Sequence, residues 1–278
     1  MWLASYPKSG NTWFRVFLTN YLRDEGQPVD INALDMQSNA ADRWLIDSAL
    51  MIESSDLIEE ELSWYRAEAY RILARRSRET LYLKIHDACP PAEGDEPLIP
   101  ADVTQGAVYL VRNPLDVSIS FAHYYAMTVD AAIERMGMDE AALAKPGPRL
   151  HPQVNQRLST WSRHVSSWID QTRFPVHLMR YEDMLRQPVE SFSAAIRLLG
   201  LPCDEQRVRT AVEFSTFARL RDQERARGFT EKPSKAEFFF RSGRADAWHA
   251  VLTEAQVFKI TADHGPVMRR LGYLPKDE

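Results

Sequence analysis

Short apolar runs alternate with stretches of helical period along the chain. The apolar runs, at residues 2–6, 81–85, 107–111 and 176–179, have the length of buried strands. Residues 11–22, 114–125, 161–169 and 189–199 place their apolar side chains on one helical stripe, and the last of these ends before Gly200 and Pro202. The pattern predicts strands that alternate with helices.

This alternation is typical of an α/β fold in three layers, with a central, mostly parallel sheet flanked by helices. Such sheets bind ligands beyond the carboxyl ends of their strands. The residues that follow the four predicted strands include Lys8, His86, Arg112 and Tyr181. We therefore expect these four side chains to meet at one edge of the sheet.

Two long stretches do not fit the sheet. Residues 30–78 look helical with an acidic segment, and residues 127–152 carry Met, Gly and Pro. Long insertions in a compact domain are often functional, so we expect helical and loop lids over an acceptor site. We predict that residues 1–278 form a single domain.

The composition is that of a soluble globular protein, with 45% hydrophobic and 26% charged residues. No apolar run is long enough for a membrane span, and the first residues read as a strand rather than a signal peptide. Cys89 and Cys203 lack metal-ligand spacing, so we expect reduced thiols in a cytoplasmic protein. The net charge of −5 argues against a nucleic-acid partner.

Positive charge is nevertheless concentrated between residues 219 and 244. The cations there are Arg219, Arg221, Arg225, Arg227, Lys232, Lys235, Arg241 and Arg244. One interpretation is a local anion site, and the other is a solvated helical face, which is the usual meaning of a charge run.

Residues 5–13, SYPKSGNTW, join the first strand to its helix. Gly10 permits a tight turn, the amides of Ser9 to Thr12 can point at one anion, and Lys8 adds a full positive charge. A Walker loop would place the lysine after the second glycine and would need a magnesium carboxylate, and neither is present. The turn predicts a phosphate site without metal, although by itself it is also compatible with a plain strand–helix connection.

The segment SYPKSGNTW closely resembles the 5′-phosphosulfate loop of the sulfotransferases that use PAPS (3′-phosphoadenosine-5′-phosphosulfate). Four more segments resemble this family in the same order, so the resemblance covers most of the chain. It implies a P-loop-like fold, PAPS as donor, its desulfated product PAP, no metal, and transfer of a sulfonate group to a hydroxyl.

The resemblance also implies site residues. VRNPLDVSIS supplies Arg112 and Ser120 for the 3′-phosphate, and FFFRSGRADAW supplies a second 3′-phosphate segment. The implied donor-binding set is Lys8, Ser9, Gly10, Asn11, Thr12, Trp13, Arg112, Ser120, Tyr181, Ser215, Phe217, Arg241, Ser242 and Gly243. Within it, Trp13 and Phe217 would sandwich the adenine, and Tyr181 and Ser215 would contact its edge.

Local alternatives exist for parts of this set. Arg112 could instead pair with Asp116 on the surface, and Trp13 and Phe217 could be ordinary core residues. Ser242 stands where the family usually has a lysine, and we hypothesise that Arg244 compensates for the lost charge.

His86 in LKIHDA occupies the position of the family's catalytic histidine. Histidine suits a base near neutrality because its ordinary pKa is about 6.5. By the same resemblance Lys8 would stabilise the leaving phosphate, and Lys84 would position the sulfonate. Asp87 replaces a leucine of the family, and we expect it to shape the acceptor pocket or to orient His86.

Two rival functions remain open at this stage. A nucleotide or nucleoside kinase would share the strand–loop–helix design but would need the missing Walker loop and magnesium ligand. A non-catalytic PAP-binding protein would keep Lys8 and Arg112 but would have no need for His86.

The acceptor is predicted only by class. Aromatic residues in and beside the expected lids suggest a small-molecule or natural-product phenol or alcohol; they are Trp44, Trp64, Tyr65, Tyr124 and Tyr125. The short chain and the sequences of its loops also resemble those of small bacterial enzymes, including those that sulfate glycopeptide antibiotics. No dimerisation motif of the animal cytosolic enzymes occurs near residue 278, so the sequence does not indicate an oligomeric state.

Overall fold

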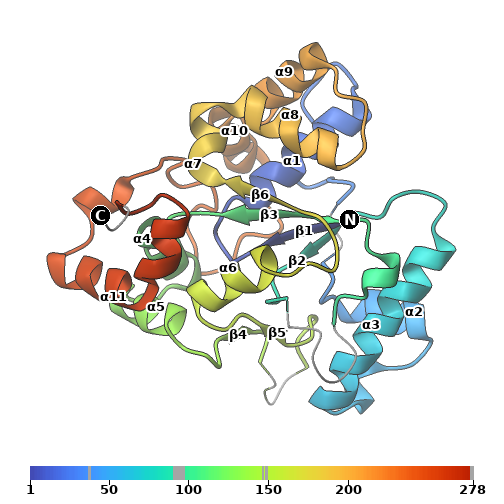
Figure 1. Ribbon diagram of the computed structural model, residues 1–278. Coiled ribbons are helices and arrows are strands. Elements are labelled where there is room, and N and C mark those ends of the chain that lie inside the picture. Colours follow the sequence, from blue (N-terminus) through green and yellow to red (C-terminus); the bar gives the residue numbers. More distant parts are fainter. Residues whose placement is uncertain (37–38, 90–97, 146, 148–149, 276–278) are drawn as a thin grey trace.

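A four-stranded parallel sheet lies at the centre of the computed structural model, which describes residues 1–36, 39–89, 98–145, 147 and 150–275 (Figure 1). Its strands are β1 (Trp2–Ser5), β2 (Leu83–Ile85), β3 (Ala107–Val111) and β6 (Val176–Arg180), in the order β2-β1-β3-β6. All three neighbouring pairs are parallel. The predicted α/β fold with a parallel sheet between helices is confirmed.

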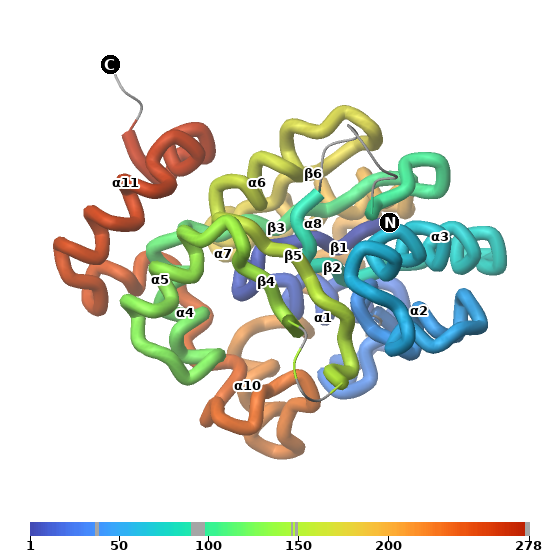
Figure 2. The backbone as a smooth tube through the Cα atoms, turned by 90° about the horizontal axis from the view of Figure 1, so that it is seen from below, coloured from blue at the N-terminus to red at the C-terminus, as the bar shows by residue number. Residues whose placement is uncertain are grey.

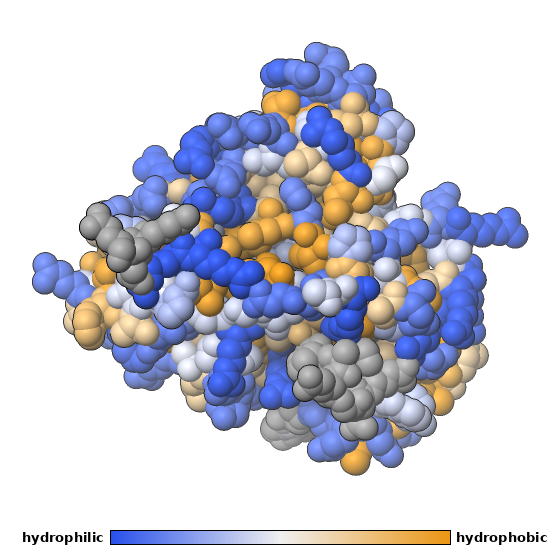
Figure 3. Space-filling view, in the orientation of Figure 1, coloured by the Kyte–Doolittle hydropathy of each residue, from blue (hydrophilic) through white to orange (hydrophobic). Residues whose placement is uncertain are grey.

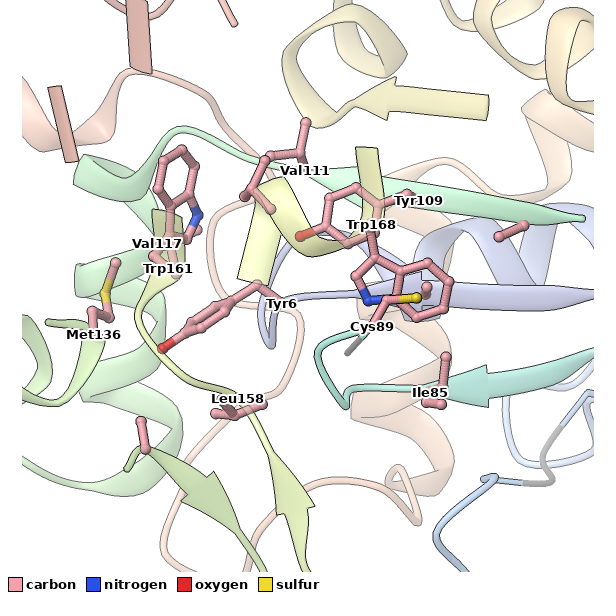
Figure 4. Packing of buried hydrophobic residues seen from close by; sticks show 14 of the residues in the cluster. Tyr6, Ile85, Cys89, Tyr109, Val111, Val117, Met136, Leu158, Trp161 and Trp168 are labelled. Atoms are coloured by element: carbon pink, nitrogen blue, oxygen red, sulfur yellow. The ribbon is translucent and has the colours of Figure 1, made fainter. Parts of the chain in front are cut away.

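The two faces of the sheet bury different side chains because successive residues of a strand point to opposite sides. On one face, Leu3, Val108 and Leu110 pack with apolar residues of α1 (Asn11–Arg23), α8 (Pro188–Leu198) and α9 (Glu205–Phe214). On the other face, Ala4 and Tyr109 pack with residues of α4 (Pro114–Tyr125) and α6 (Trp161–Ile169). Figure 4 shows this second layer, with Tyr6, Tyr109 and Trp168 in one cluster.

The predicted helices at residues 114–125 and 161–169 match α4 and α6. Their starts follow ordinary capping rules: Asn113 caps α4 before Pro114, and the Thr160 hydroxyl accepts from the Arg163 amide of α6. Further elements outside the predicted lids are α7 (Tyr181–Arg186), α10 (Phe217–Arg227), α11 (Glu254–Arg270), and the 3-10 turns η2 (Ala101–Val103) and η3 (Ala247–Ala250).

The segment 30–78 contains α2 (Arg43–Leu50), η1 (Ser54–Asp56) and α3 (Glu59–Arg76), which pack together around a small apolar cluster at one side of the sheet (Figure 2). The segment 127–152 contains α5 (Val129–Met136) and β4 (Ala142–Leu143), which pairs antiparallel with β5 (Gln156–Arg157). Residues 37–38, 146 and 148–149 of these predicted lids lie outside the described residues.

Four of the eight cations in this stretch lie on helix α10, and most of these four form ion pairs within the protein. Arg219 contacts Glu213 at 2.8 Å, and Arg227 contacts Asp30 at 3.0 Å. For this helix the interpretation as a solvated face is the better one. Of the cations in this stretch, Arg241, which follows α10, lines the cavity described below.

Other general expectations can be compared with the described part of the chain. No helix in it is long and apolar enough to cross a membrane. Cys89 is buried and Cys203 is exposed, and both thiols are free.

Candidate active site

A cavity of about 920 Å³ opens at the carboxyl ends of the strands. Most of the predicted site residues line it: Lys8, Gly10, Asn11, Thr12, Trp13, Lys84, His86, Arg112, Ser120, Tyr181, Phe217, Arg241, Ser242 and Gly243. The fold therefore brings together side chains that are more than 200 positions apart in the sequence. In Figure 3, apolar side chains gather in the middle of one face of the molecule, surrounded by a mostly hydrophilic rim.

The turn between β1 and α1 opens the start of α1 toward this cavity. Lys8 and Gly10 both have positive φ, 71° and 100°, which turns the chain sharply. A Cβ at Gly10 would lie 2.9 Å from the ring of Tyr181, so only glycine fits there. Asn11 links the start of α1 to β1, because its Nδ2 donates to the Leu3 carbonyl at 2.8 Å. The free amides at the start of a 13-residue helix can then face an anion.

Two residues of the predicted donor-binding set, Ser9 and Ser215, do not line the cavity. Ser215 is fully buried, and its hydroxyl donates to the carbonyl of Ala211 at 2.8 Å. This hydrogen bond occupies the hydroxyl at the C-terminal end of α9. Its neighbour Thr216 lines the cavity instead. Ser9 is also buried beneath the turn, and its Oγ has no hydrogen-bond partner among the described residues.

Lys8 lines the cavity and contacts two aromatic rings. Its Nζ is 4.0 Å from the ring centroid of Tyr124 and 4.2 Å from that of Phe239, distances typical of cation–π contacts. Burial, together with the nearby charges of Lys84 and Arg112, lowers the pKa of Lys8 to about 7. The rings hold the ammonium group in place while leaving it free to accept an anionic partner.

Lys84 belongs to a charged network that was not predicted from the sequence. Its Nζ is 3.2 Å from Oε2 of Glu231, and the same carboxylate receives two bonds from Nη2 of the fully buried Arg15, at 2.7 and 2.8 Å. Burial raises the pKa of Glu231, but Lys84 and Arg15 outweigh it and hold the pKa at about 2. Only the presence of an acid within the cation-rich stretch could have drawn attention to Glu231.

His86 follows β2 directly, and its ring is oriented by the first strand. Nδ1 lies 2.8 Å from the carbonyl oxygen of Ser5. A carbonyl oxygen only accepts, so Nδ1 carries the proton and the lone pair of the neutral ring is on Nε2. Burial and the charge of Lys84 lower the pKa of His86 to about 3, which keeps the ring neutral at pH 7. Among the described residues nothing is hydrogen-bonded to Nε2.

Asp87 neither lines the cavity nor contacts the imidazole, which corrects the expectation for this residue. It is buried and receives two bonds from Arg66 of α3, at 3.1 and 2.7 Å, and one from the Arg157 amide at 3.1 Å. Asp87 therefore fastens α3 and β5 to the end of β2. The sequence pattern could not distinguish this role because Arg66 lies 21 positions earlier, on a separate helix.

Arg112 lies at the end of β3 with its guanidinium over the Tyr181 ring, 4.4 Å from the centroid. Its Nη2 donates to the main-chain carbonyl of Arg244 at 2.9 Å and lies 3.8 Å from Asp116. Asp116 is mainly engaged with the amides of residues 246 and 248, at 2.8 and 3.1 Å. The alternative of a simple surface ion pair therefore explains little of the Arg112 environment.

The segment 238–248, predicted to bind the 3′-phosphate, packs against Phe217 at Gly243. Gly243 has φ of +62°, and a Cβ there would lie 2.3 Å from the Phe217 ring. Trp13 lines the same cavity and meets Tyr181 edge to face at 5.7 Å. Two aromatic side chains thus border the cavity, as predicted for Trp13 and Phe217. Both rings also pack against the buried apolar cluster that contains Val16 and Leu220, so they have a core-packing role as well.

The predicted lids contribute unequally to the cavity. Tyr124 and Tyr125 line it, whereas Trp44, Trp64 and Tyr65 of the helical lid do not. Trp44 and Trp64 are 78% and 54% exposed because they lie on the outer side of α2 and α3. The missed lining residues of the second lid are Arg135, Leu143, Ala144, His151 and Pro152.

The described residues contain no group of three or more His, Cys, Asp or Glu side chains that could hold a metal ion. The charged side chains of the cavity are instead those of Lys8, Lys84, Arg112, Arg135, Arg241, Asp116 and Glu231. Cations outnumber acids among them, and both acids already have partners. The cavity is suited to an anionic ligand.

The parallel sheet carries a lysine-bearing turn and an imidazole at the same edge. This arrangement is typical of α/β proteins in which an anion site lies beside a candidate base. The family model described as "Sulfotransferase domain" matches residues 1–272. The chain belongs to this sulfotransferase family.

Several characterised relatives are similar at low identity. Sulfotransferase 1A1 of Canis lupus familiaris is 25% identical over 178 residues, covering 59% of this chain and 55% of that protein. The chain thus spans about half the length of this relative. Flavonol 3-sulfotransferase of Flaveria bidentis is 21% identical over 276 residues, covering 94% of this chain and 78% of that protein. The expected bacterial origin stays a prediction.

Solved structures share the fold. Mouse sulfotransferase SULT7A1 complexed with PAP has a TM-score of 0.60 at 20% identity, covering 97% of this chain and 84% of that one. Retinol dehydratase in complex with androsterone and inactive cofactor PAP has a TM-score of 0.62 at 17% identity, covering 96% and 80%.

Proposed function

We propose that the protein is an enzyme that transfers the sulfonate group of PAPS to a hydroxyl of a small-molecule acceptor. The observation that carries the proposal is the orientation of His86, whose Nε2 is free in the same cavity as Lys8 and Lys84. A base and two cations are what transfer from a phosphosulfate to a hydroxyl requires.

The donor fits the polar groups that line and underlie the cavity. The Ser9 hydroxyl and the Nε of Arg112 are buried without hydrogen-bond partners among the described residues, so each can satisfy a phosphate oxygen after a small adjustment. Lys8 and the start of α1 would hold the 5′ end, and Arg112, Ser120 and Arg241 would hold the 3′-phosphate. Trp13 and Phe217 offer aromatic faces for adenine. Two structural neighbours are described with PAP, which supports this choice of donor.

PAPS would supply an activated sulfonate, and the residues of the chain would position it and move a proton. Nε2 of His86 would accept the proton of the acceptor hydroxyl while Ser5 holds the other ring nitrogen. An anion bound next to the ring favours the imidazolium, so it would raise the pKa of His86 from about 3 toward the working range. Lys8 and Lys84 would stabilise the charge that develops on the leaving phosphate.

A transfer screen tests the proposal directly. The protein would be incubated with PAPS and a panel of phenols, alcohols, amines and glycopeptides, and products would be detected by mass spectrometry. PAP is expected to raise the melting temperature in the absence of magnesium, whereas ATP with magnesium is not. Stabilisation by ATP with magnesium, but not by PAP, would favour a kinase. Tight PAP binding without transfer to any acceptor would favour a non-catalytic protein.

Arg241→Ala is expected to weaken PAP binding by about tenfold to a hundredfold, because it removes a charged hydrogen-bond donor from the cavity. Arg244→Ala is the matched control. The Arg244 side chain does not line the cavity, and this residue offers Arg112 its main-chain carbonyl, which alanine retains. Calorimetric titration with PAP would measure both constants. Equal losses for the two variants would support the hypothesis that Arg244 compensates for the lysine missing at Ser242.

PAP binding at pH 8 is expected to take up a proton at Lys8. With a pKa of about 7, Lys8 is mostly neutral in the free protein at pH 8, and a bound phosphate raises that pKa. At pH 6 the group is already protonated, so its uptake falls toward zero. Calorimetry in buffers of different ionisation enthalpy gives the proton count. Subtracting the Lys8→Met count removes protons that titrate on PAP itself, and an identical count in both proteins would contradict the prediction.

A further inference from the structure

Arg135 brings a positive charge to the cavity that the proposed donor does not use. It lies on α5, within the predicted second lid, and it lines the cavity together with Tyr125 and Leu143. Its guanidinium carbon is 5.4 Å from the ring centroid of Tyr125 and 5.6 Å from that of Phe121. The aromatic contacts hold the planar group against one wall without neutralising it.

The hydrogen bonds of Arg135 use a small part of its capacity. Nη2 donates to the carbonyl of Ala142 at 2.6 Å. A guanidinium has five N–H donors. Arg135 forms no ion pair within the described part of the chain, and the two acids of the cavity are engaged elsewhere: Glu231 with Lys84 and Arg15, and Asp116 with main-chain amides.

The other cations of the cavity each have a partner or a place in the proposed donor site. Lys84 contacts Glu231, and Lys8, Arg112 and Arg241 are assigned to the phosphates of the donor. After this assignment Arg135 is the remaining cation among the described lining residues. A charge left without a counter-ion beside aromatic walls lowers the affinity for neutral apolar ligands and favours an anion.

We propose that Arg135 selects acceptors that carry a carboxylate in addition to the reacting hydroxyl, with hydroxyaryl acids as the best-fitting class. The inference rests on the proposed sulfonate transfer. The fork of Arg135 would bind the carboxylate in a bidentate manner, and Tyr125 would lie against the aryl ring. His86, which lines the same cavity, would then meet the hydroxyl at the opposite end of the acceptor.

Acceptor pairs that differ only in charge test this inference. The acids are 4-hydroxybenzoic, 4-hydroxyphenylacetic and 3-(4-hydroxyphenyl)propionic acid, which span three lengths, and each is compared with its methyl ester. The wild-type kcat/KM is expected to favour the best acid over its ester by about tenfold to a hundredfold. Arg135→Met is expected to bring that ratio close to one, chiefly by lowering the kcat/KM of the acid about tenfold or more.

Two further variants separate selectivity from a structural effect. Arg135→Lys keeps the charge but loses the fork, so an intermediate preference for the acid is expected. Arg163→Gln removes a neighbouring surface cation, which is paired with Asp139 at 3.0 Å and does not line the cavity, and it is expected to keep the wild-type preference. An unchanged ratio in Arg135→Met, or a wild-type protein that prefers the esters, would overturn the inference.

A binding measurement distinguishes this inference from the proposed function. Calorimetry of each acid against the protein with PAP bound requires no transfer, and Arg135→Met is expected to weaken acid binding about tenfold or more. If the acids bind through Arg135 but no acceptor is ever sulfated, the proposed transfer fails and the carboxylate site stands. If the screen finds good neutral acceptors while the acids neither bind nor react, the transfer stands and the carboxylate site fails.

Discussion

Replacing His86 with alanine is expected to lower the rate of sulfonate transfer by about 10²- to 10⁴-fold, which is the usual contribution of a general base. The reason lies in the orientation of the ring, because Nδ1 is 2.8 Å from the carbonyl of Ser5 and Nε2 is left as the acceptor of a proton. Single-turnover transfer from PAPS to an acceptor found in the screen would measure the loss.

Donor binding should survive this replacement. His86 contributes no charge at pH 7, so the rise in melting temperature caused by PAP is expected to stay close to that of the wild type. His151→Ala is the matched control, since this exposed imidazole also lines the cavity but accepts a local bond from the Gln153 amide at 3.0 Å. Near-normal transfer by His86→Ala would sink the assignment of the base.

Replacing Asp87 with alanine is expected to lower the free energy of unfolding by about 3–5 kcal/mol, because it leaves the guanidinium of Arg66 buried without its counter-ion. Both side chains are nearly inaccessible, 4% for Arg66 and 2% for Asp87. Burial alone would lower the pKa of Arg66, but Asp87 raises it above the ordinary value, which marks a strong interaction. Urea unfolding followed by circular dichroism would measure the change.

An exposed pair provides the comparison for Asp87. Glu205 and Arg209 are neighbours on α9 with side chains 69% and 56% exposed, and Glu205→Ala is expected to cost less than about 1 kcal/mol. Replacing Arg66 with Met and Asp87 with Leu together should recover part of the stability lost in Asp87→Ala, since no charge is then left unpaired. A loss below 1 kcal/mol for Asp87→Ala would show that the pair contributes little.

The strands and the helices that begin at a clear cap were predictable because their signals are local. Residues 107–111 form a continuous apolar run, and α4 starts with Asn113 before Pro114, so both boundaries follow from neighbouring residues. Helix α9 was not predicted, and α10 was considered only as a charged helical face, because charged residues interrupt the apolar stripe of α10. The position of α9 depends on its packing against α1 and α8, which no local pattern records.

The same distinction applies to the site. Lys8, His86 and Arg112 were predictable because each follows a strand, and parallel strands end at a common edge. Glu231 and Arg135 were not, because their roles depend on which distant groups they face: Glu231 lies 147 positions from Lys84. Asp87 was placed correctly beside the site but given the wrong role, since its partner Arg66 comes from another helix.

The network of Arg15, Lys84 and Glu231 also dictates when the site can form during synthesis. Chains emerge from the ribosome in sequence order, so α1 and β2 are available long before the segment after α10. Until residue 231 appears, Arg15 has no carboxylate to neutralise its charge at a position that is fully buried in the finished protein. The turn between β1 and α1 is therefore made well before the carboxylate of Glu231, and a chain released before residue 231 would carry this turn without that charged partner of Arg15.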